Sequence, residues 1–136
     1  MSGVYARNRN LSSFEYFSNA IAIRTAVTQL VTSSAVPKSY RFVLAVPMAE
    51  TARSLVFNLV KSDAFYPNNE RNVAERKHYM TLAVADCEQL YQDIQCLLSL
   101  GLPVSASRFE ALAESLDAEI NLIKGARKGV KLIGKG

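Results

Sequence analysis

The residues of this sequence most suited to binding chemistry are lysines and arginines. Two arginines lie within residues 1–10, and residues 124–136 carry five cations and no acid. Basic runs of this kind contact the phosphates of a nucleic acid or attract an acidic protein. Shorter basic groups begin at Lys38 and Arg71. The candidate binding residues are Arg7, Arg9, Lys38, Arg41, Arg71, Arg76, Lys77, Lys124, Arg127, Lys128 and Lys131.

The net charge of +4 is unevenly distributed along the 136 residues. Residues 11–123 carry a net charge of −3, so the positive balance comes from the two ends of the sequence. Residues 82–123 alone hold seven acids and one base. Basic ends on an acidic body favour a polyanion or a charged protein as partner. The alternative is that the terminal cations serve solubility.

Other site chemistry finds little support in the residue types. One histidine and two cysteines do not supply the ligands of a zinc site. Glu75 and His78 have the Glu-x-x-His spacing of di-iron helical bundles, which require two copies of that motif. We expect no metal, no cofactor and no enzyme activity. Cys87 and Cys96 lie among apolar residues, so both thiols are expected to be free and buried in a reducing cytoplasm.

Apolar periodicity predicts four helices and no strand. Ser12 and Ser107 each precede a glutamate by three residues, which is the capping-box spacing of a helix start. Gly101 and Gly125 are typical of helix ends. The expected helices are residues 12–33, 38–64, 70–100 and 107–124. Pro47 should kink the second helix or divide it in two.

Four long helices joined by short turns predict an all-α fold, an antiparallel up-down four-helix bundle. Residues 1–136 form one domain in this interpretation, with a basic arm (1–10) and a basic tail (124–136). In an antiparallel bundle the arm, the start of the third helix and the tail meet at one end. The start of the second helix, with Lys38 and Arg41, lies at the other.

The second helix is apolar around more than one side. A helix of this kind is buried on more than one side, which favours a homo-oligomer. Uninterrupted apolar runs stay well short of the roughly 18 residues that span a membrane. Residues 1–10 are polar and basic and do not resemble a secretory signal. We therefore expect a soluble cytoplasmic protein without a membrane partner.

Five short segments occur in an order and spacing found in a known family. They are residues 9–16 (RNLSSFEY), 37–42 (PKSYRF), 66–69 (YPNN), 75–77 (ERK) and 122–128 (LIKGARK). Over nearly its whole length the chain resembles the four-helix-bundle family of the accessory variability determinant (Avd) of diversity-generating retroelements. The proteins encoded in 23S rRNA intervening sequences belong to the same group. The chain differs from the Avd pattern in its acidic body and in Pro47.

This resemblance implies a homo-oligomeric bundle, in Avd a pentameric barrel. Such a protein binds a reverse transcriptase and nucleic acid through a basic surface, and it assists cDNA synthesis without a catalytic centre. The basic residues within or beside the matching motifs are Arg9, Lys38, Arg41, Arg76, Lys77, Lys124, Arg127 and Lys128.

The leading hypothesis is a non-enzymatic accessory protein that binds RNA or DNA and a cognate reverse transcriptase during diversity-generating retrohoming. The alternative is a homo-oligomeric interaction scaffold that does not bind nucleic acid. A metal-binding bundle is a third and weaker hypothesis, because the sequence holds a single histidine.

Overall fold

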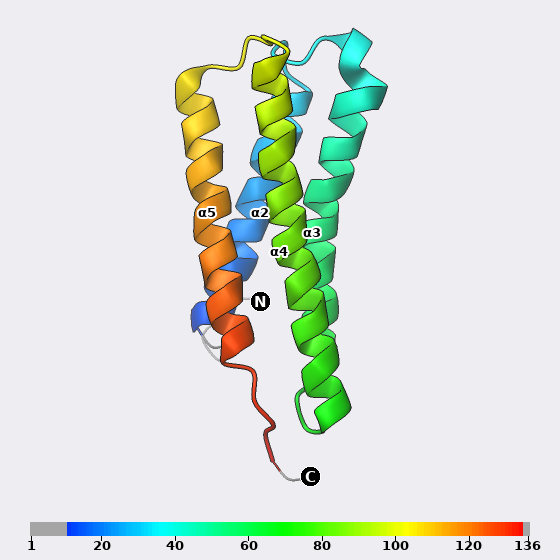
Figure 1. Ribbon diagram of the computed structural model, residues 1–136, viewed down its shortest axis with the longest axis vertical. Coiled ribbons are helices and arrows are strands. Elements are labelled where there is room, and N and C mark those ends of the chain that lie inside the picture. The colour runs from blue at the N-terminus through cyan, green and yellow to red at the C-terminus, as the bar shows by residue number, and fades with distance from the viewer. Residues whose placement is uncertain (1–10, 135–136) are drawn as a thin grey trace, which may run out of the picture.

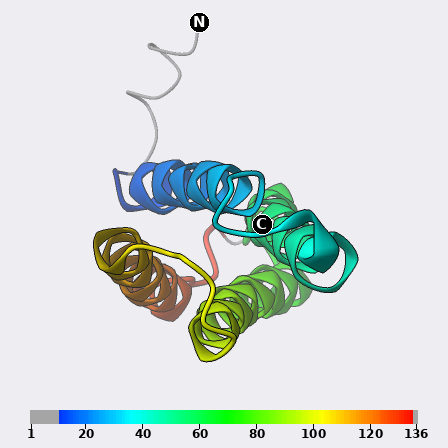
Figure 2. The same ribbon diagram turned by 90° about the horizontal axis from the view of Figure 1, so that it is seen from above.

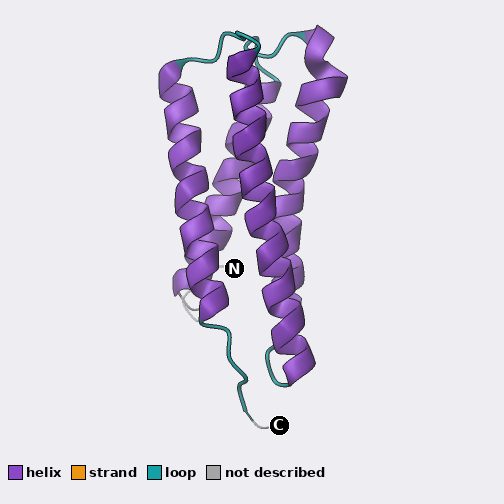
Figure 3. Ribbon diagram, viewed as in Figure 1, coloured by secondary structure: helices purple, strands orange, loops and turns teal. Residues whose placement is uncertain are grey.

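The computed structural model describes residues 11–134, with side chains from residue 15 onward. Four α-helices stand side by side (Figures 1 and 3). They are α2 (Leu11–Val31), α3 (Val46–Ala64), α4 (Glu70–Ser99) and α5 (Ala106–Lys128). The described range contains no strand, so the prediction of an all-α chain with four helices is confirmed.

The helices follow one another around a central core. Each helix contacts the next along the chain, and α2 also contacts α5. Viewed from above, α3 and α5 therefore lie across the domain from each other (Figure 2). The α2–α3 and α4–α5 connections lie at one end, called here the upper end. The α3–α4 turn and the segment after α5 lie at the opposite, lower end (Figure 1).

The core is built from the apolar residues that recur at intervals of three and four. On α2, Ala20, Ile23, Val27 and Leu30 are each at most 1% exposed. The facing helices contribute leucines, isoleucines and methionines at the same intervals. Full burial of one such aliphatic side chain stabilises the fold by about 1.5–3 kcal/mol. Hydrophobic burial on one stripe of each helix is therefore what aligns the four helices.

The second helical stretch is irregular before Pro47. It starts as a 3₁₀ turn, η1 (Lys38–Tyr40), continues as a π-helical turn, η2 (Arg41–Ala45), and becomes α-helical in α3. The Val46 N–H donates to the carbonyl of Arg41, five residues earlier. Pro47 cannot donate to the carbonyl of Val43, and its ring would collide with that carbonyl in a regular helix. The wider π turn accommodates the proline, which then occupies the first turn of α3.

Two predicted helix boundaries of α5 are wrong. The N-cap is Ser105, whose hydroxyl accepts a hydrogen bond from the Arg108 N–H at 3.3 Å, and Ser107 lies inside the helix. Gly125 does not end the helix, which continues to Lys128. A glycine inside a helix costs about 1 kcal/mol relative to alanine, which the packing of the flanking residues offsets.

The end of α2 also differs from the prediction. The described part of the helix starts at Leu11, the first described residue, and the side chain of Ser12, the expected cap, lies outside the described residues. It ends at Val31 because Thr32 and Ser33 turn their hydroxyls back onto the last carbonyls. Hydroxyl side chains that bond to nearby backbone in this way compete with helix propagation.

The two cysteines are free, as predicted, but only one is buried. Cys87 is 0% exposed, whereas Cys96 is exposed. Nine residues at about 100° each rotate the two side chains to opposite sides of α4. The prediction that both thiols are buried is therefore wrong for Cys96.

One helical stretch is long and apolar enough, by length and composition, to cross a membrane. It is the 27-residue stretch Lys38–Ala64, with a mean hydropathy of 1.3 and 33% of its apolar window buried. The sequence prediction considered uninterrupted apolar runs, and this stretch is interrupted by Glu50 and Arg53. A core helix of a soluble protein passes the same composition test.

Candidate nucleic-acid interface

The basic residues of α4 and α5 come together at the lower end. Arg71, Arg76 and Lys77 lie in the first turns of α4, which begins there. Lys124, Arg127 and Lys128 lie in the last turns of α5, which ends there, and Lys131 follows in the chain after it (Figure 1). Arg7 and Arg9 lie outside the described residues.

Hydrogen bonds fix the turn on which this end is built. Asn69 caps α4 by accepting the Asn72 N–H at 2.8 Å, and the Asn72 amide donates to the Tyr66 carbonyl at 2.9 Å. The Ile133 N–H donates to the Pro67 carbonyl at 2.8 Å. Because that bond crosses from the segment after α5 to the α3–α4 turn, the basic segment lies against the turn.

Arg76 is bound within the chain. Its guanidinium donates to the Phe65 carbonyl at 2.9 Å and the Ser62 carbonyl at 3.4 Å, and it pairs with Asp63 at 3.4 Å. The Arg76 side chain is only 16% exposed. These contacts join the start of α4 to the end of α3. Arg76 therefore positions the α3–α4 turn, and its charge is partly neutralised.

The remaining cations of this end are not neutralised by any ion pair within residues 11–134. The Arg127 guanidinium donates to the Thr81 hydroxyl at 3.0 Å, and that hydroxyl donates to the Lys77 carbonyl at 3.0 Å. Lys77 and Arg127 are half-buried along this α4–α5 seam, while the other four are exposed. We call the six residues the lower-end cations: Arg71, Lys77, Lys124, Arg127, Lys128 and Lys131.

A groove of about 520 Å³ opens beside these residues. Its lining includes Arg76, Lys131, Tyr66 and Asn121 together with apolar side chains from α4 and α5. Tyr66 is 59% exposed. An exposed aromatic ring next to cations is the combination on which single-stranded nucleic acids stack their bases.

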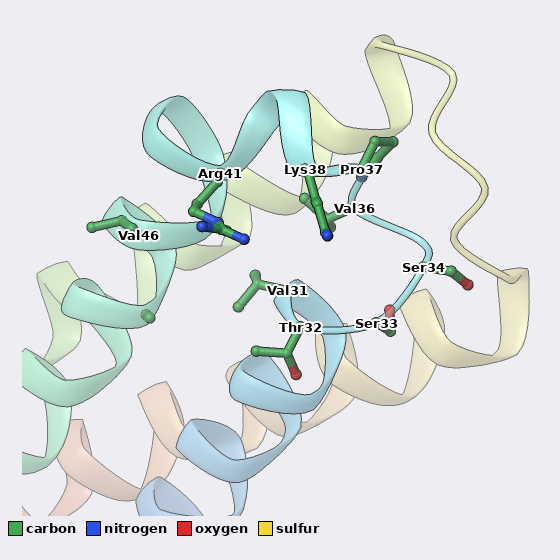
Figure 4. A pocket seen from close by; sticks show the side chains of 11 residues that line it. Val31, Thr32, Ser33, Ser34, Val36, Pro37, Lys38, Arg41 and Val46 are labelled. Atoms are coloured by element: carbon green, nitrogen blue, oxygen red, sulfur yellow. The ribbon is translucent and has the colours of Figure 1, made fainter.

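Lys38 and Arg41 lie at the upper end, as expected. Both are exposed and line a second cavity of about 630 Å³, between the end of α2 and the start of the following helical stretch (Figure 4). The structure therefore does not bring these two residues together with the lower-end cations.

The outward side of η2 and α3 exposes several large apolar residues. We call them the α3 outer face: Phe42 (78% exposed), Val43, Val46, Phe57 (45%) and Val60. Lys61 and Arg53 lie over the Phe57 ring, at 4.2 and 5.4 Å from its centroid. Monomeric proteins rarely expose large contiguous apolar patches, which usually mark interaction surfaces.

Sequence reasoning missed a buried carboxyl group at the centre of α5. Glu119 is 0% exposed, and its Oε1 accepts a hydrogen bond from the Asn19 side chain at 3.1 Å. No partner for Oε2 occurs in the described residues. Burial raises the pKa of Glu119 to about 8, and the Asn19 hydrogen bond only partly opposes that rise. The sequence does contain a sign of this burial: Leu116, Glu119 and Ile123 are spaced at three and four, so the glutamate falls on the apolar side of the helix.

Burial also raises the pKa of the Cys87 thiol, and the nearby Glu119 adds to the rise. A thiol of this kind is a poor nucleophile, because the thiolate is the reactive form. Within residues 11–134, no group of three or more His, Cys, Asp or Glu side chains is arranged to hold a metal ion.

The geometry defines an all-α, four-helix protein with a cationic lower end and an exposed apolar outer face. Comparison with known proteins finds no similar one: no family model, no curated protein and no solved structure matches the chain.

Proposed function

We propose that this protein is a non-enzymatic accessory factor that binds nucleic acid, RNA or DNA, through its lower end. The observation that carries the proposal is the gathering of six cations without ion-pair partners in residues 11–134, drawn from two helix ends far apart in sequence. A cation in the first turn of α4 works against the helix dipole, so stability alone does not account for Arg71 there.

The resemblance to the Avd family supplies the rest of the proposal. The partner is a cognate reverse transcriptase, the process is cDNA synthesis during diversity-generating retrohoming, and the compartment is the cytoplasm. Arg7 and Arg9 belong to the same interface in this proposal. The motif at residues 122–128, which contains three of the lower-end cations, is part of that resemblance.

In this proposal the chain is an antiparallel up-down bundle that assembles into a ring, such as the pentamer of Avd. The α3 outer face supports self-assembly because it is apolar and carries Arg53 and Lys61. The exposed side of α5, across the domain, carries Glu110, Glu114 and Asp117. Two complementary surfaces on opposite sides of one chain favour head-to-tail contacts, which close into rings when the rotation allows.

The nucleic-acid proposal is tested by the salt dependence of binding. Replacing Arg127, Lys128 and Lys131 with glutamine removes three phosphate contacts. The slope of log affinity against log salt for a single-stranded RNA should then fall by about 2, at about 0.7 per contact. Fluorescence anisotropy with matched 20-nucleotide RNA and DNA strands measures the slope and the preference between them.

The matched control replaces Arg24 with glutamate and Arg108 with glutamine, which removes the same three units of net charge away from the lower end and from the α3 outer face. An equal fall in both variants would mean that only net charge matters, and the interface would be refuted. Circular dichroism checks that the loss of the Arg127–Thr81 hydrogen bond has not unfolded the triple variant.

A second candidate function, an oligomeric scaffold without nucleic-acid binding, is favoured by the α3 outer face. Replacing Val46 and Val60 with glutamate should dissociate the oligomer, because burying two charges in an apolar interface costs several kcal/mol. Replacing Ile21, which is 54% exposed on α2, with glutamate is the control. Light scattering after size exclusion reports the mass. An oligomer that forms normally while binding no RNA or DNA at any salt concentration would select the scaffold function.

A further inference from the structure

The upper-end cavity has the dimensions of a small-molecule site. Its volume of about 630 Å³ falls within the range of roughly 300–1,000 Å³ that ligand pockets occupy. The lining is mostly apolar: Val31, Val36 and Ala45 are each at most 9% exposed, and Val46 and Ala49 complete this surface. An apolar surface of this size suits the body of an organic ligand.

The charged groups of the cavity all have the same sign. Lys38 and Arg41 are the only charged residues in its lining, and neither has an ion-pair partner within residues 11–134. Figure 4 shows the ammonium and the guanidinium pointing toward the same space beside Val31. Two uncompensated cations that share one space attract an anion, and the guanidinium offers a bidentate contact to phosphate.

Stability of the fold does not explain these two cations. They open the helical stretch Lys38–Ala64, where the helix dipole disfavours positive charge. The neighbouring end of α2 has donors of its own. Thr32 donates to the Thr28 carbonyl and Ser33 to the Leu30 carbonyl, each at 2.7 Å. The Thr28 and Leu30 carbonyls at that helix end therefore do not depend on the two cations.

We propose that this cavity binds a nucleotide. The phosphate lies between Lys38 and Arg41, and the base packs on the apolar surface formed by Val31, Val36 and Ala45. The nucleotide is either free or one residue of a single strand, since both present a phosphate together with a planar base whose faces can pack on an apolar surface. The cavity is at the opposite end from the lower-end cations, so this site stands independently of the proposed nucleic-acid interface.

Calorimetric titration of the full chain with AMP, adenosine and inorganic phosphate tests the proposal. AMP should bind at least tenfold more tightly than either adenosine or inorganic phosphate, because only AMP uses both the cations and the apolar surface. Lys38→Met combined with Arg41→Gln should weaken AMP binding at least tenfold. Arg24→Gln combined with Arg108→Gln removes the same charge outside the cavity and should leave AMP affinity unchanged.

Ala49→Leu provides a second test that alters no charge. The larger side chain occupies the apolar part of the cavity and is nearly as favourable in a helix as alanine, so AMP affinity should fall at least tenfold while the fold is retained. The oligonucleotide r(A)6 identifies the source of the nucleotide. AMP binding points to a free nucleotide, whereas binding of r(A)6 alone, lost in the Lys38/Arg41 double variant, points to a strand.

Three results would overturn the proposal. They are the absence of binding by both AMP and r(A)6, equal affinity for AMP and adenosine, and binding that survives the Lys38/Arg41 double variant or Ala49→Leu. Variants of the lower-end cations separate the two sites. If Arg127, Lys128 and Lys131 to glutamine abolished AMP binding, the phosphate would belong to the lower end and not to this cavity.

Discussion

The buried carboxyl of Glu119 predicts an unusual dependence of stability on pH. The pKa is raised from its ordinary value of 4.5 to about 8 in the folded protein, mainly by burial. Between these values the unfolded chain releases the proton while the folded chain keeps it. The contribution of Glu119 to stability is therefore greatest below about pH 4.5 and is progressively lost as the pH rises toward 8.

The magnitude follows from about 1.4 kcal/mol per pKa unit. A pH of 7.5 lies about three units above the pKa of the glutamate in the unfolded chain. Keeping the proton on Glu119 at this pH therefore costs the folded state about 4 kcal/mol. Glu119→Gln keeps the shape and the acceptor for Asn19 but cannot ionise. We expect the variant to equal the parent near pH 4.5 and to exceed its free energy of unfolding by about 4 kcal/mol at pH 7.5.

Urea unfolding followed by circular dichroism at pH 4.5, 6, 7.5 and 9 measures this difference. Burial also raises the pKa of Asp86 and Asp93, but both residues remain in the variant, so their contributions cancel. Glu114→Gln, at an exposed position on the same helix, should show no growing difference. A difference between Glu119→Gln and the parent that stays constant from pH 4.5 to 7.5 would refute the reasoning, because Glu119 would then titrate as an exposed carboxyl.

Three further predictions concern local structure. Ser105→Ala should lower the free energy of unfolding by about 1 kcal/mol through loss of the α5 cap, while Ser107→Ala should change it little; urea midpoints decide between the two serines. Gly101→Ala should lower the free energy of unfolding, measured by thermal unfolding, by about 1–2 kcal/mol. Gly101 has φ +74°, and the added Cβ would meet no atom within 4 Å, so the cost comes from backbone strain alone. Cys96 should react with a maleimide within seconds to minutes in the native state and Cys87 only after unfolding, which mass spectrometry resolves; equal labelling would contradict the burial of Cys87.

The helices could be predicted from sequence because their signal is local and repeated. The recurrence of Ala20, Ile23, Val27 and Leu30 at three and four identifies one stripe of α2 without reference to any other segment. The ends were harder to predict. Ser105 and Ser107 lie two residues apart at the start of α5, and the path of the preceding loop decides which of them caps the helix.

Tertiary contacts explain the remaining differences at the candidate site. The order of the helices was enough to place the basic residues of α4 and α5 at one end. It could not show that Arg76 reaches the Phe65 carbonyl, because that contact depends on the course of the α3–α4 turn. The spacing of Leu112, Leu116, Ile120 and Ile123 at three and four favours Ile120 as a core residue of α5. In the structure Ile120 is half-buried and its neighbour Glu119 takes the fully buried place.

The π-helical turn of η2 makes the upper end sensitive to chain length. Its hydrogen bond from Val46 to Arg41 spans five residues, one more than an α-helix uses. Deleting a single residue such as Val43 would remove the residue that widens this turn and would rotate everything before the deletion by about 100°, carrying Lys38 away from the end of α2. For this corner of the molecule, insertions and deletions are therefore more consequential evolutionary events than substitutions. Related sequences that keep the cavity should therefore keep the same number of residues between Pro37 and Pro47.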